Sequence, residues 1–207
     1  MSIDPVKYLS KADPQLAGVI KTVGKYSIKI RTNAFLSLVE SIIYQQLAGS
    51  AANIIYTRFI NHYNNVLPKP MQIISTSDIE LKSKIGLSSN KVQYLKDLST
   101  KVEQGKINLE LLSTMSDEEV IAELTLVKGI GRWTAEMILM FTLGREDVFA
   151  VDDLGIQQSV AKLYKLDISD KKVMKEMNEK YKDQKDKEMP FDMKRMAYGG
   201  FKALIDA

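Results

Sequence analysis

The hydrophobic positions along the chain recur at the spacing of an α-helix almost everywhere. Across residues 33–47, apolar side chains return every three or four positions and would form one face of a helix. Ser116 followed by Glu119 forms a capping box, which predicts that a helix starts near Asp117. The only strand-like run, residues 25–30, is short. The pattern therefore predicts an all-α fold.

Two of the predicted helices, residues 118–127 and 132–143, are separated only by the tetrapeptide KGIG at 128–131. Its two glycines permit a positive φ and a close backbone approach. The second helix begins with free backbone N–H groups and the positive end of its dipole, which together favour phosphate binding. Lys128 and Arg132 flank this end with positive charge. A corner that merely packs two helices would use the same hairpin, so the pattern leaves both interpretations open.

Two acidic residues, Asp152 and Asp153, interrupt an apolar run where another helix is expected to begin. One aspartate can serve as the N-cap, which stabilises a helix by about 1 kcal/mol. The other is either a first-turn charge that the helix dipole favours, or a carboxylate held ionised beside a phosphate-binding hairpin.

Composition narrows the chemistry that the chain can perform. The 207 residues include no cysteine, which excludes disulfides, thiolate zinc sites and iron–sulfur clusters. A single histidine, His62, argues against a histidine metal site and a Ser-His-Asp triad. The net charge of +3 permits a nucleic-acid partner without requiring one. The chain lacks a transmembrane-length apolar run and a signal peptide, so we expect a cytoplasmic or nuclear protein that is not secreted.

The stretch "LVKGIGRWTAEMIL", followed by "DVFAVDDLGIQQ", resembles the helix-hairpin-helix DNA glycosylases. The resemblance is strongest to the alkylbase branch, the 3-methyladenine DNA glycosylase II type. It covers residues 13–158 and includes the upstream segments 35–59 and 85–99 in the expected order and spacing. It implies a single glycosylase unit, residues 1–207, built as a two-lobed helical bundle. One lobe would be about 31–145, the other 1–30 plus 146–207, with the active-site cleft between them.

The same resemblance implies how the hairpin contacts DNA and a cation. A DNA phosphate would accept hydrogen bonds from the backbone N–H groups of Gly129, Gly131 and Thr134. A structural Na⁺ or K⁺ would bind the backbone carbonyls of Thr125, Val127 and Ile130. No other cofactor is expected.

Two further segments match the family's groove contacts. Gln46, with Gln45 as the second choice, matches a helix-end glutamine that enters the minor groove where the base has left. A polar helix end explains these glutamines equally well. Leu87 and Ser89 lie in the loop that offers a wedge into the duplex, and Leu87 is the apolar candidate.

The resemblance also assigns the reaction class. Bifunctional members carry a lysine on the second hairpin helix, and that position is Trp133 here. Tryptophan cannot form a Schiff base, so a monofunctional hydrolase is predicted. The indole would stack on a flipped, cationic alkylated purine, with Met137, Leu154 and Tyr44 beside it in the base pocket.

Asp153 matches the family's catalytic carboxylate. A fixed anion near C1′ stabilises the oxocarbenium-like sugar and orients the attacking water. Asp152 is the second choice, because other branches place the acid at a slightly shorter spacing; otherwise it is the N-cap or an orienting neighbour.

The predicted activity is release of 3-methyladenine, 7-methylguanine and similar bases from damaged double-stranded DNA in base excision repair. Ethenoadenine and hypoxanthine are further candidate lesions. We expect a monomer with no membrane partner. The alternatives are a non-catalytic helix-hairpin-helix DNA-binding module and a bifunctional glycosylase/AP lyase.

Overall fold

The computed structural model describes residues 7, 10–11, 13–23, 29–145, 148, 150 and 152–166. Within these ranges every regular element is helical, which confirms the predicted all-α fold. The chain divides into two compact units: one is Arg31–Leu143, and the other combines Met1–Ile30 with Gly144–Ala207. The strand-like run at 25–30 is described only at its last two residues, which form no strand. The part of the second predicted lobe beyond residue 166 lies outside the described residues.

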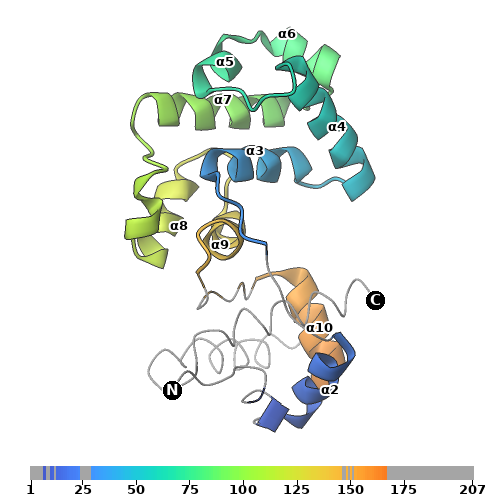
Figure 1. Ribbon diagram of the computed structural model, residues 1–207. Helices are drawn as coiled ribbons and strands as arrows, with labels where there is room; N and C mark the ends of the chain where they lie inside the picture. The colour runs from blue at the N-terminus through green and yellow to red at the C-terminus, as the bar shows by residue number, and fades with distance from the viewer. Residues whose placement is uncertain are drawn as a thin grey trace. The chain divides into compact units, whose positions relative to one another are not determined.

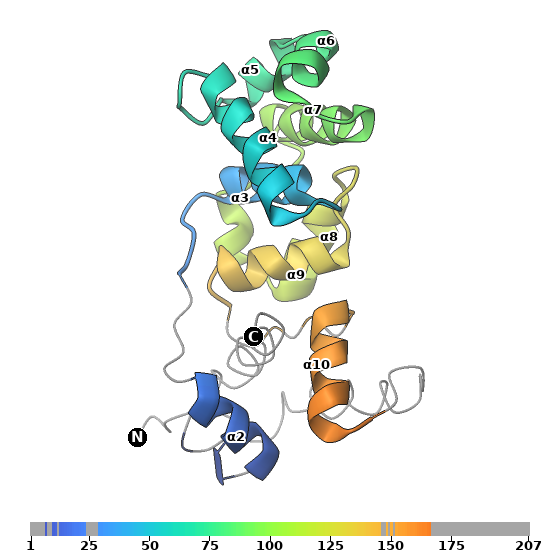
Figure 2. The ribbon, with the colours of Figure 1, turned by 90° about the vertical axis from the view of Figure 1, so that its right-hand side faces the viewer.

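The unit Arg31–Leu143 consists of helices and short helical turns (Figure 1). Its elements in chain order are α3 (Ala34–Tyr44), α4 (Gly49–His62), α5 (Pro70–Ser75), α6 (Asp78–Glu80), the π-helical turn η1 (Leu81–Ile85), α7 (Ser89–Glu103), the 3₁₀ turn η2 (Leu111–Thr114), α8 (Asp117–Thr125) and α9 (Arg132–Phe141). Figures 1 and 2 show α3 between α7 on one side and α9 on the other, and α3 contacts both. It is the central helix of this unit.

The central position of α3 follows from its sequence. Glu40 is its only charged residue. Four of its aliphatic side chains are completely buried: Leu38, Val39, Ile42 and Ile43. Burying a side chain of this size stabilises the fold by roughly 1.5–3 kcal/mol. Asn33 caps the first turn, because its side-chain oxygen accepts a hydrogen bond from the Leu36 N–H at 2.9 Å.

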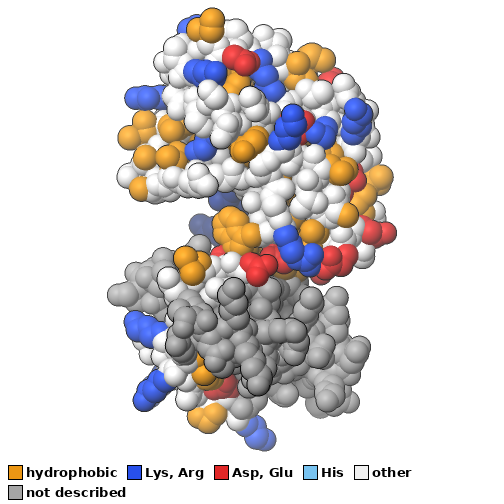
Figure 3. Space-filling view, turned by 180° about the vertical axis from the view of Figure 1, so that it is seen from behind, with side chains coloured by type: hydrophobic (Ala, Val, Ile, Leu, Met, Phe, Trp, Pro, Cys, Tyr) orange, Lys and Arg blue, Asp and Glu red, His pale blue; other side chains and the backbone are white. Residues whose placement is uncertain are grey.

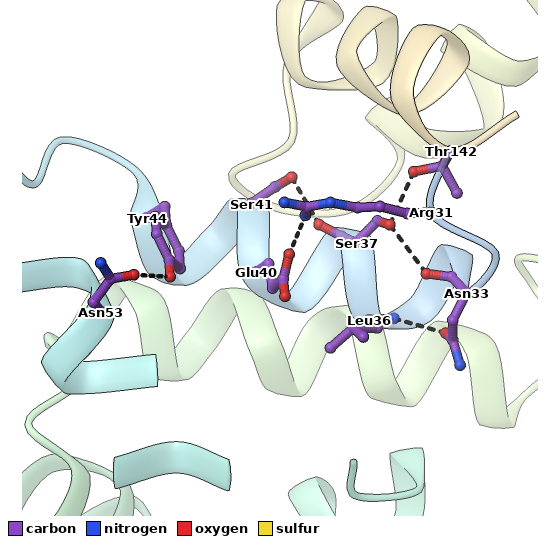
Figure 4. A network of polar contacts seen from close by, with 9 residues as sticks. All are labelled: Arg31, Asn33, Leu36, Ser37, Glu40, Ser41, Tyr44, Asn53 and Thr142. Atoms are coloured by element: carbon purple, nitrogen blue, oxygen red, sulfur yellow. Dashed lines mark hydrogen bonds and ion pairs between the residues drawn. The ribbon is translucent and has the colours of Figure 1, made fainter. Parts of the chain in front are cut away.

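Polar contacts attach the end of α9 to the start of α3 (Figure 4). The Thr142 hydroxyl donates to the Ser37 hydroxyl at 2.9 Å in a buried position. The Arg31 N–H donates to the Phe141 carbonyl at 2.8 Å, and the Arg31 guanidinium forms an ion pair with Glu40. These bonds fix the two ends of the Arg31–Leu143 segment beside each other.

Local capping signals set the starts of α7 and α8. Ser116 and Glu119 form the predicted capping box, in which the Ser116 N–H donates to the Glu119 carboxylate at 2.8 Å. Ser88 caps α7, because its side chain accepts a hydrogen bond from the Lys91 N–H. Both helices begin where short-range chemistry predicts.

In the second unit, α2 (Pro14–Val23) contacts α10 (Leu154–Tyr164). Apolar side chains from both helices are buried: Leu16, Val19, Ile156 and Val160. The Tyr164 hydroxyl donates to the Asp13 carboxylate at 2.5 Å and links the end of α10 to the residue that precedes α2.

Candidate functional site

The glycine hairpin connects α8 to α9. Gly129 has a φ of +81°, a backbone conformation that favours glycine. A Cβ atom on Gly129 would lie 2.2 Å from Cδ2 of the Tyr94 ring. Gly131 has an ordinary φ of −97°, and a Cβ atom there would meet no atom within 4 Å. The first glycine therefore shapes and packs the turn, whereas the second keeps the space in front of α9 open.

The N-terminus of α9 has no side-chain cap. Gly131 occupies the N-cap position, and the first backbone bond of the helix runs from the Ala135 N–H to the Gly131 carbonyl at 3.1 Å. The backbone N–H of Thr134 therefore precedes the helical ladder, while its side chain is buried. An uncapped helix start carries positive potential and oriented N–H groups, which suit a phosphate oxygen.

Two side chains from other helices hold the hairpin. Asp97 of α7 accepts a hydrogen bond from the Lys128 N–H at 2.8 Å and pairs with Lys101 at 2.5 Å. Burial raises the pKa of Asp97, but the bonds from Lys101 and the Lys128 N–H outweigh it and hold that pKa below its usual range. At the end of α3, the Gln45 side-chain amide donates to the Gly129 carbonyl at 2.7 Å.

Arg132 pairs with carboxylates on both helices of the hairpin. Its guanidinium forms an ion pair with Glu118 at 2.6 Å and a second with Glu136 at 3.2 Å. These ion pairs link α9 to α8, while the Arg132 side chain remains 45% exposed, so its contact with DNA stays a prediction. The sequence pattern concealed this because Glu118 lies 14 positions away, on the preceding helix.

Trp133 and Met137 occupy neighbouring positions on α9, one helical turn apart. Trp133, the only tryptophan of the chain, is 44% exposed. It therefore does not simply fill the core, and its indole is accessible for stacking. Met137, four residues further along the helix, is half-buried.

Tyr44, the last residue of α3, has its hydroxyl engaged within its own unit. It donates to the Asn53 side-chain oxygen (Figure 4), and its ring centroid lies 6.0 Å from that of Tyr56. Burial, followed by the charge of Glu40, raises the pKa of Tyr44. The phenol is therefore neutral at neutral pH and offers an aromatic surface, not a base.

Of the two aspartates, Asp153 is the N-cap of α10. Its carboxylate accepts a hydrogen bond from the Ile156 N–H at 2.9 Å, and the side chain is half-buried. Asp152 is exposed in the preceding turn. The interpretation of Asp152 as the N-cap is thus wrong: the cap and the predicted catalytic carboxylate are the same residue. Leu154 follows as the first residue of α10 and is 62% exposed.

Comparison with known proteins places this hairpin and the capped helix in a family. The model of the "HhH-GPD superfamily base excision DNA repair protein" matches residues 39–183, which include the second half of α3, the hairpin and α10. The chain belongs to the HhH-GPD superfamily.

Named HhH-GPD relatives cover most of the chain. It is 36% identical to DNA-3-methyladenine glycosylase 1 of Schizosaccharomyces pombe over 174 residues, which are 78% of this chain and 75% of that protein. It is 32% identical to the DNA-3-methyladenine glycosylase of Saccharomyces cerevisiae over 171 residues, 75% of this chain and 57% of that protein.

Two solved structures share the fold. A DNA-3-methyladenine glycosidase from Bacillus halodurans superposes with a TM-score of 0.78 at 34% identity, covering 97% of this chain and 89% of that one. The S. pombe 3-methyladenine DNA glycosylase Mag1, in complex with abasic DNA, gives a TM-score of 0.79 at 31% identity, covering 96% and 95%.

The two glutamines assigned to the minor groove in this HhH-GPD chain have separate positions. The side chain of Gln45 is bound to the hairpin, as described above. Gln46 is exposed and adopts a left-handed backbone conformation with a φ of 55°. Gln46 therefore remains the candidate for the minor-groove contact, whereas the Gln45 side chain is already bound to the hairpin.

The wedge assignment also requires correction. Leu87 is only 4% exposed, and its N–H donates to the Leu81 carbonyl at 3.2 Å. It precedes the cap Ser88, and Val92 at the fourth helical position is buried as well, which is the arrangement of a hydrophobic staple. Leu87 is a core residue and not a wedge. Ser89 is exposed at the first position of α7.

The carbonyls assigned to a cation lie at the end of α8 and in the turn. The Val127 carbonyl accepts the Ile130 N–H at 3.1 Å, and the Lys128 N–H points to Asp97 instead of back into the helix. The side chains of Val127 and Ile130 are buried, which fixes the turn. Neutral carbonyl oxygens suit an alkali cation. Among the described residues no cluster of three or more His, Cys, Asp or Glu side chains could hold another metal.

Two residues that support the hairpin escaped the sequence interpretation. Tyr94 and Asp97 lie three positions apart on α7, and both contact the hairpin from a helix about 30 residues upstream, as the Asp97–Lys128 separation of 31 shows. Their spacing on one helix face was a usable signal, but nothing local indicates what that face contacts.

Lys128 is expected to contribute one phosphate contact to DNA binding. Its side chain is exposed. On the face shown in Figure 3, the Lys and Arg side chains of its unit are spread among acidic and apolar ones. We therefore expect the loss of one lysine–phosphate contact to be measurable. Lys128→Met should lower the slope of log K against log salt concentration by about 0.9 in magnitude, measured with an undamaged duplex.

The matched control for Lys128→Met is Lys106→Met, which removes another exposed lysine, in the bend that follows α7. This variant should keep the wild-type salt dependence. Equal losses of slope in both variants would contradict a phosphate contact specific to the hairpin.

Proposed function

We propose that this chain is a monofunctional DNA glycosylase that hydrolyses the N-glycosidic bond of alkylated purines in duplex DNA and leaves an abasic site in base excision repair. The observation that carries the proposal is the uncapped start of α9 behind a glycine hairpin, in a chain whose relatives are named 3-methyladenine DNA glycosylases. The best candidate substrates are 3-methyladenine and 7-methylguanine, followed by ethenoadenine and hypoxanthine.

The hairpin binds the DNA backbone. The N–H groups of Gly129, Gly131 and Thr134 donate to a phosphate, and the positive end of the α9 dipole stabilises its charge. Lys128 adds a mobile positive charge at the same place. Because these contacts do not involve the bases, the hairpin fixes the position of the strand and not its sequence.

The flipped base stacks on Trp133. An alkylated purine carries a positive charge, and an indole face attracts a cation more strongly than other aromatic rings do. Met137, one turn further along the same face of α9, and Tyr44 add apolar surface to the pocket. The pocket therefore favours cationic bases over neutral ones.

Asp153 stabilises the sugar during bond cleavage. The C1′–N bond breaks and its electron pair stays on the base, so a cationic alkylated purine leaves as a neutral molecule without a general acid. The oxocarbenium-like sugar is stabilised by the Asp153 carboxylate. Water then adds to C1′ and releases its proton to the carboxylate or to solvent.

Trp133 at the position of the lyase lysine predicts the absence of a covalent intermediate. Borohydride reduction during incubation with methylated duplex should trap no protein–DNA adduct, because the indole nitrogen does not form a Schiff base. A glycosylase/AP lyase treated in parallel serves as the positive control and must yield an adduct. A trapped adduct with this chain would support the bifunctional alternative.

The decisive experiment for the proposed function is the analysis of bases released from methylated duplex DNA by chromatography. A glycosylase releases methylpurines in proportion to enzyme and time. The competing interpretation, a non-catalytic helix-hairpin-helix module, predicts salt-sensitive duplex binding with no base release.

Three further attributes belong to this proposal. A Na⁺ or K⁺ ion held by the carbonyls of Thr125, Val127 and Ile130 would add positive charge beside the phosphate, and no other cofactor is needed. The protein acts as a monomer on damaged double-stranded DNA, in the cytoplasm or nucleus where the chromosome lies. Within the described residues, no helix has the length and apolar character needed to cross a bilayer.

A further inference from the structure

A buried ammonium group from α7 binds the C-terminal end of α3. Lys91 of α7 is buried, and its Nζ donates to the Ile43 carbonyl at 2.7 Å. Ile43 is in the last turn of α3, where carbonyls lack helical partners and the dipole favours a positive charge. Burial lowers the pKa of Lys91, yet the helix end keeps a partner for the ammonium group. This bond therefore fixes the position at which the chain leaves α3.

The same face of α7 also supports the hairpin. Lys91, Tyr94 and Asp97 are spaced three residues apart and lie along one side of the helix. Lys91 binds α3, the Tyr94 ring packs against Gly129, and Asp97 accepts the Lys128 N–H. One rigid helix thus positions two loops that are more than 80 residues apart, as the 84-residue separation of Gln45 and Gly129 shows.

Gln45 connects these two loops directly. Its side-chain amide donates to the Gly129 carbonyl at 2.7 Å, while its own N–H closes α3 on the Ser41 carbonyl at 3.2 Å. The next residue, Gln46, is in the left-handed region with a φ of 55°. A residue other than glycine is strained in this region and persists there where its surroundings enforce it. The bonds of Gln45 to Gly129 and of Lys91 to Ile43 hold the backbone on the N-terminal side of Gln46.

We propose that Gln45 is a positioning residue that sets the distance between the Gln46 turn and the phosphate-binding hairpin. The inference rests on the proposed function, because it takes Gln46 as the side chain that occupies the gap left by the flipped nucleotide. The hairpin and Gln46 would contact one duplex at two points. The Gln45–Gly129 bond keeps those points in register, so it matters for recognising a gap and not for gripping intact DNA.

The test measures binding selectivity, defined as the affinity for a duplex with a tetrahydrofuran abasic-site analogue divided by that for the undamaged duplex. Gln45→Met keeps the side-chain length and removes the donor. It should reduce selectivity about fivefold, the value of one neutral hydrogen bond, with undamaged binding changed less than twofold. Gln104→Met, an exposed glutamine at the other end of α7, is the matched control and should keep wild-type selectivity.

A double-mutant cycle separates positioning from general support of the fold. Gln46→Ala should lower selectivity by itself, and adding Gln45→Met to it should have no further effect, since nothing remains to be positioned. Additive losses, or an equal loss of undamaged binding in Gln45→Met, would overturn the proposal.

A second variant guards against misfolding of Gln45→Met. In Gln45→Glu the carboxylate repels the Gly129 carbonyl at neutral pH, but once protonated its O–H can donate to that carbonyl. Selectivity of Gln45→Glu, relative to Gln45→Met at the same pH, should therefore recover as the pH is lowered from about 6.5 to about 4, across the ordinary glutamate pKa of about 4.3. No recovery would count against the bond.

These measurements do not require catalysis, so they separate the two proposals. A wild-type protein that prefers the abasic duplex but releases no base would contradict the proposed function and leave the positioning role supported. A wild-type protein without that preference would overturn the positioning role itself.

Discussion

Asp153→Asn should nearly abolish base release from methylated DNA and leave the fold intact. Asparagine keeps the oxygen that accepts the Ile156 N–H at 2.9 Å, and it caps helices as well as aspartate does. Only the negative charge is lost. Removing one preorganised electrostatic contact to a transition state typically costs 10²–10³-fold in rate, so single-turnover base release should fall by roughly that factor.

The control for this prediction is Asp152→Asn. Asp152 is exposed in the turn before the cap, so its variant should retain near wild-type base release. Both variants should bind undamaged duplex as the wild type does and unfold at the same temperature. Full activity in Asp153→Asn together with loss in Asp152→Asn would move the catalytic role to the other aspartate.

Gly129→Ala should destabilise the protein and weaken DNA binding together. A side chain at φ +81° costs about 1–2 kcal/mol. The new Cβ would also lie 2.2 Å from Cδ2 and 2.5 Å from Cγ of the Tyr94 ring, near the base of that side chain, so the ring or the hairpin must shift. Overpacking of this kind adds about 1–3 kcal/mol. Denaturant unfolding and duplex binding measure the two effects.

Gly131→Ala is the matched control for Gly129→Ala. The backbone at Gly131 is ordinary, and the added methyl meets no atom within 4 Å, so the free energy of unfolding should fall by less than about 1 kcal/mol, the cost of alanine at an N-cap. Duplex affinity should nevertheless fall, because the methyl stands before the α9 N-terminus where the phosphate approaches. Equal stability losses in both variants would contradict the separate roles of the two glycines.

The helical fold could be read from the sequence because its signals are local. The Ser116–Glu119 capping box and the apolar face of α3 act within a few residues, and both occur where predicted. Such contacts depend on short-range geometry alone.

The supporting contacts of the candidate site could not be read in this way. Gln45 meets Gly129 across 84 residues, and Arg132 pairs with Glu118 across a hairpin, so their partners depend on how helices pack. Leu87 looked like a wedge because it sits in an expected loop, yet burial beside the start of α7 stabilises it more than exposure would. The resemblance to the alkylbase branch selects Asp153, and its capping role adds a structural reason for its orientation.

The central claim is that a glycine hairpin holds the strand while a fixed carboxylate acts on the flipped nucleotide's sugar. The most direct measurement is a crystal structure of the Asp153→Asn variant with a duplex that contains one methylated purine. The account predicts hydrogen bonds from the Gly131 and Thr134 N–H groups to one phosphate, and the residue-153 side chain facing C1′ of the extruded nucleotide. A complex in which both residue 152 and residue 153 face away from that sugar would contradict the account.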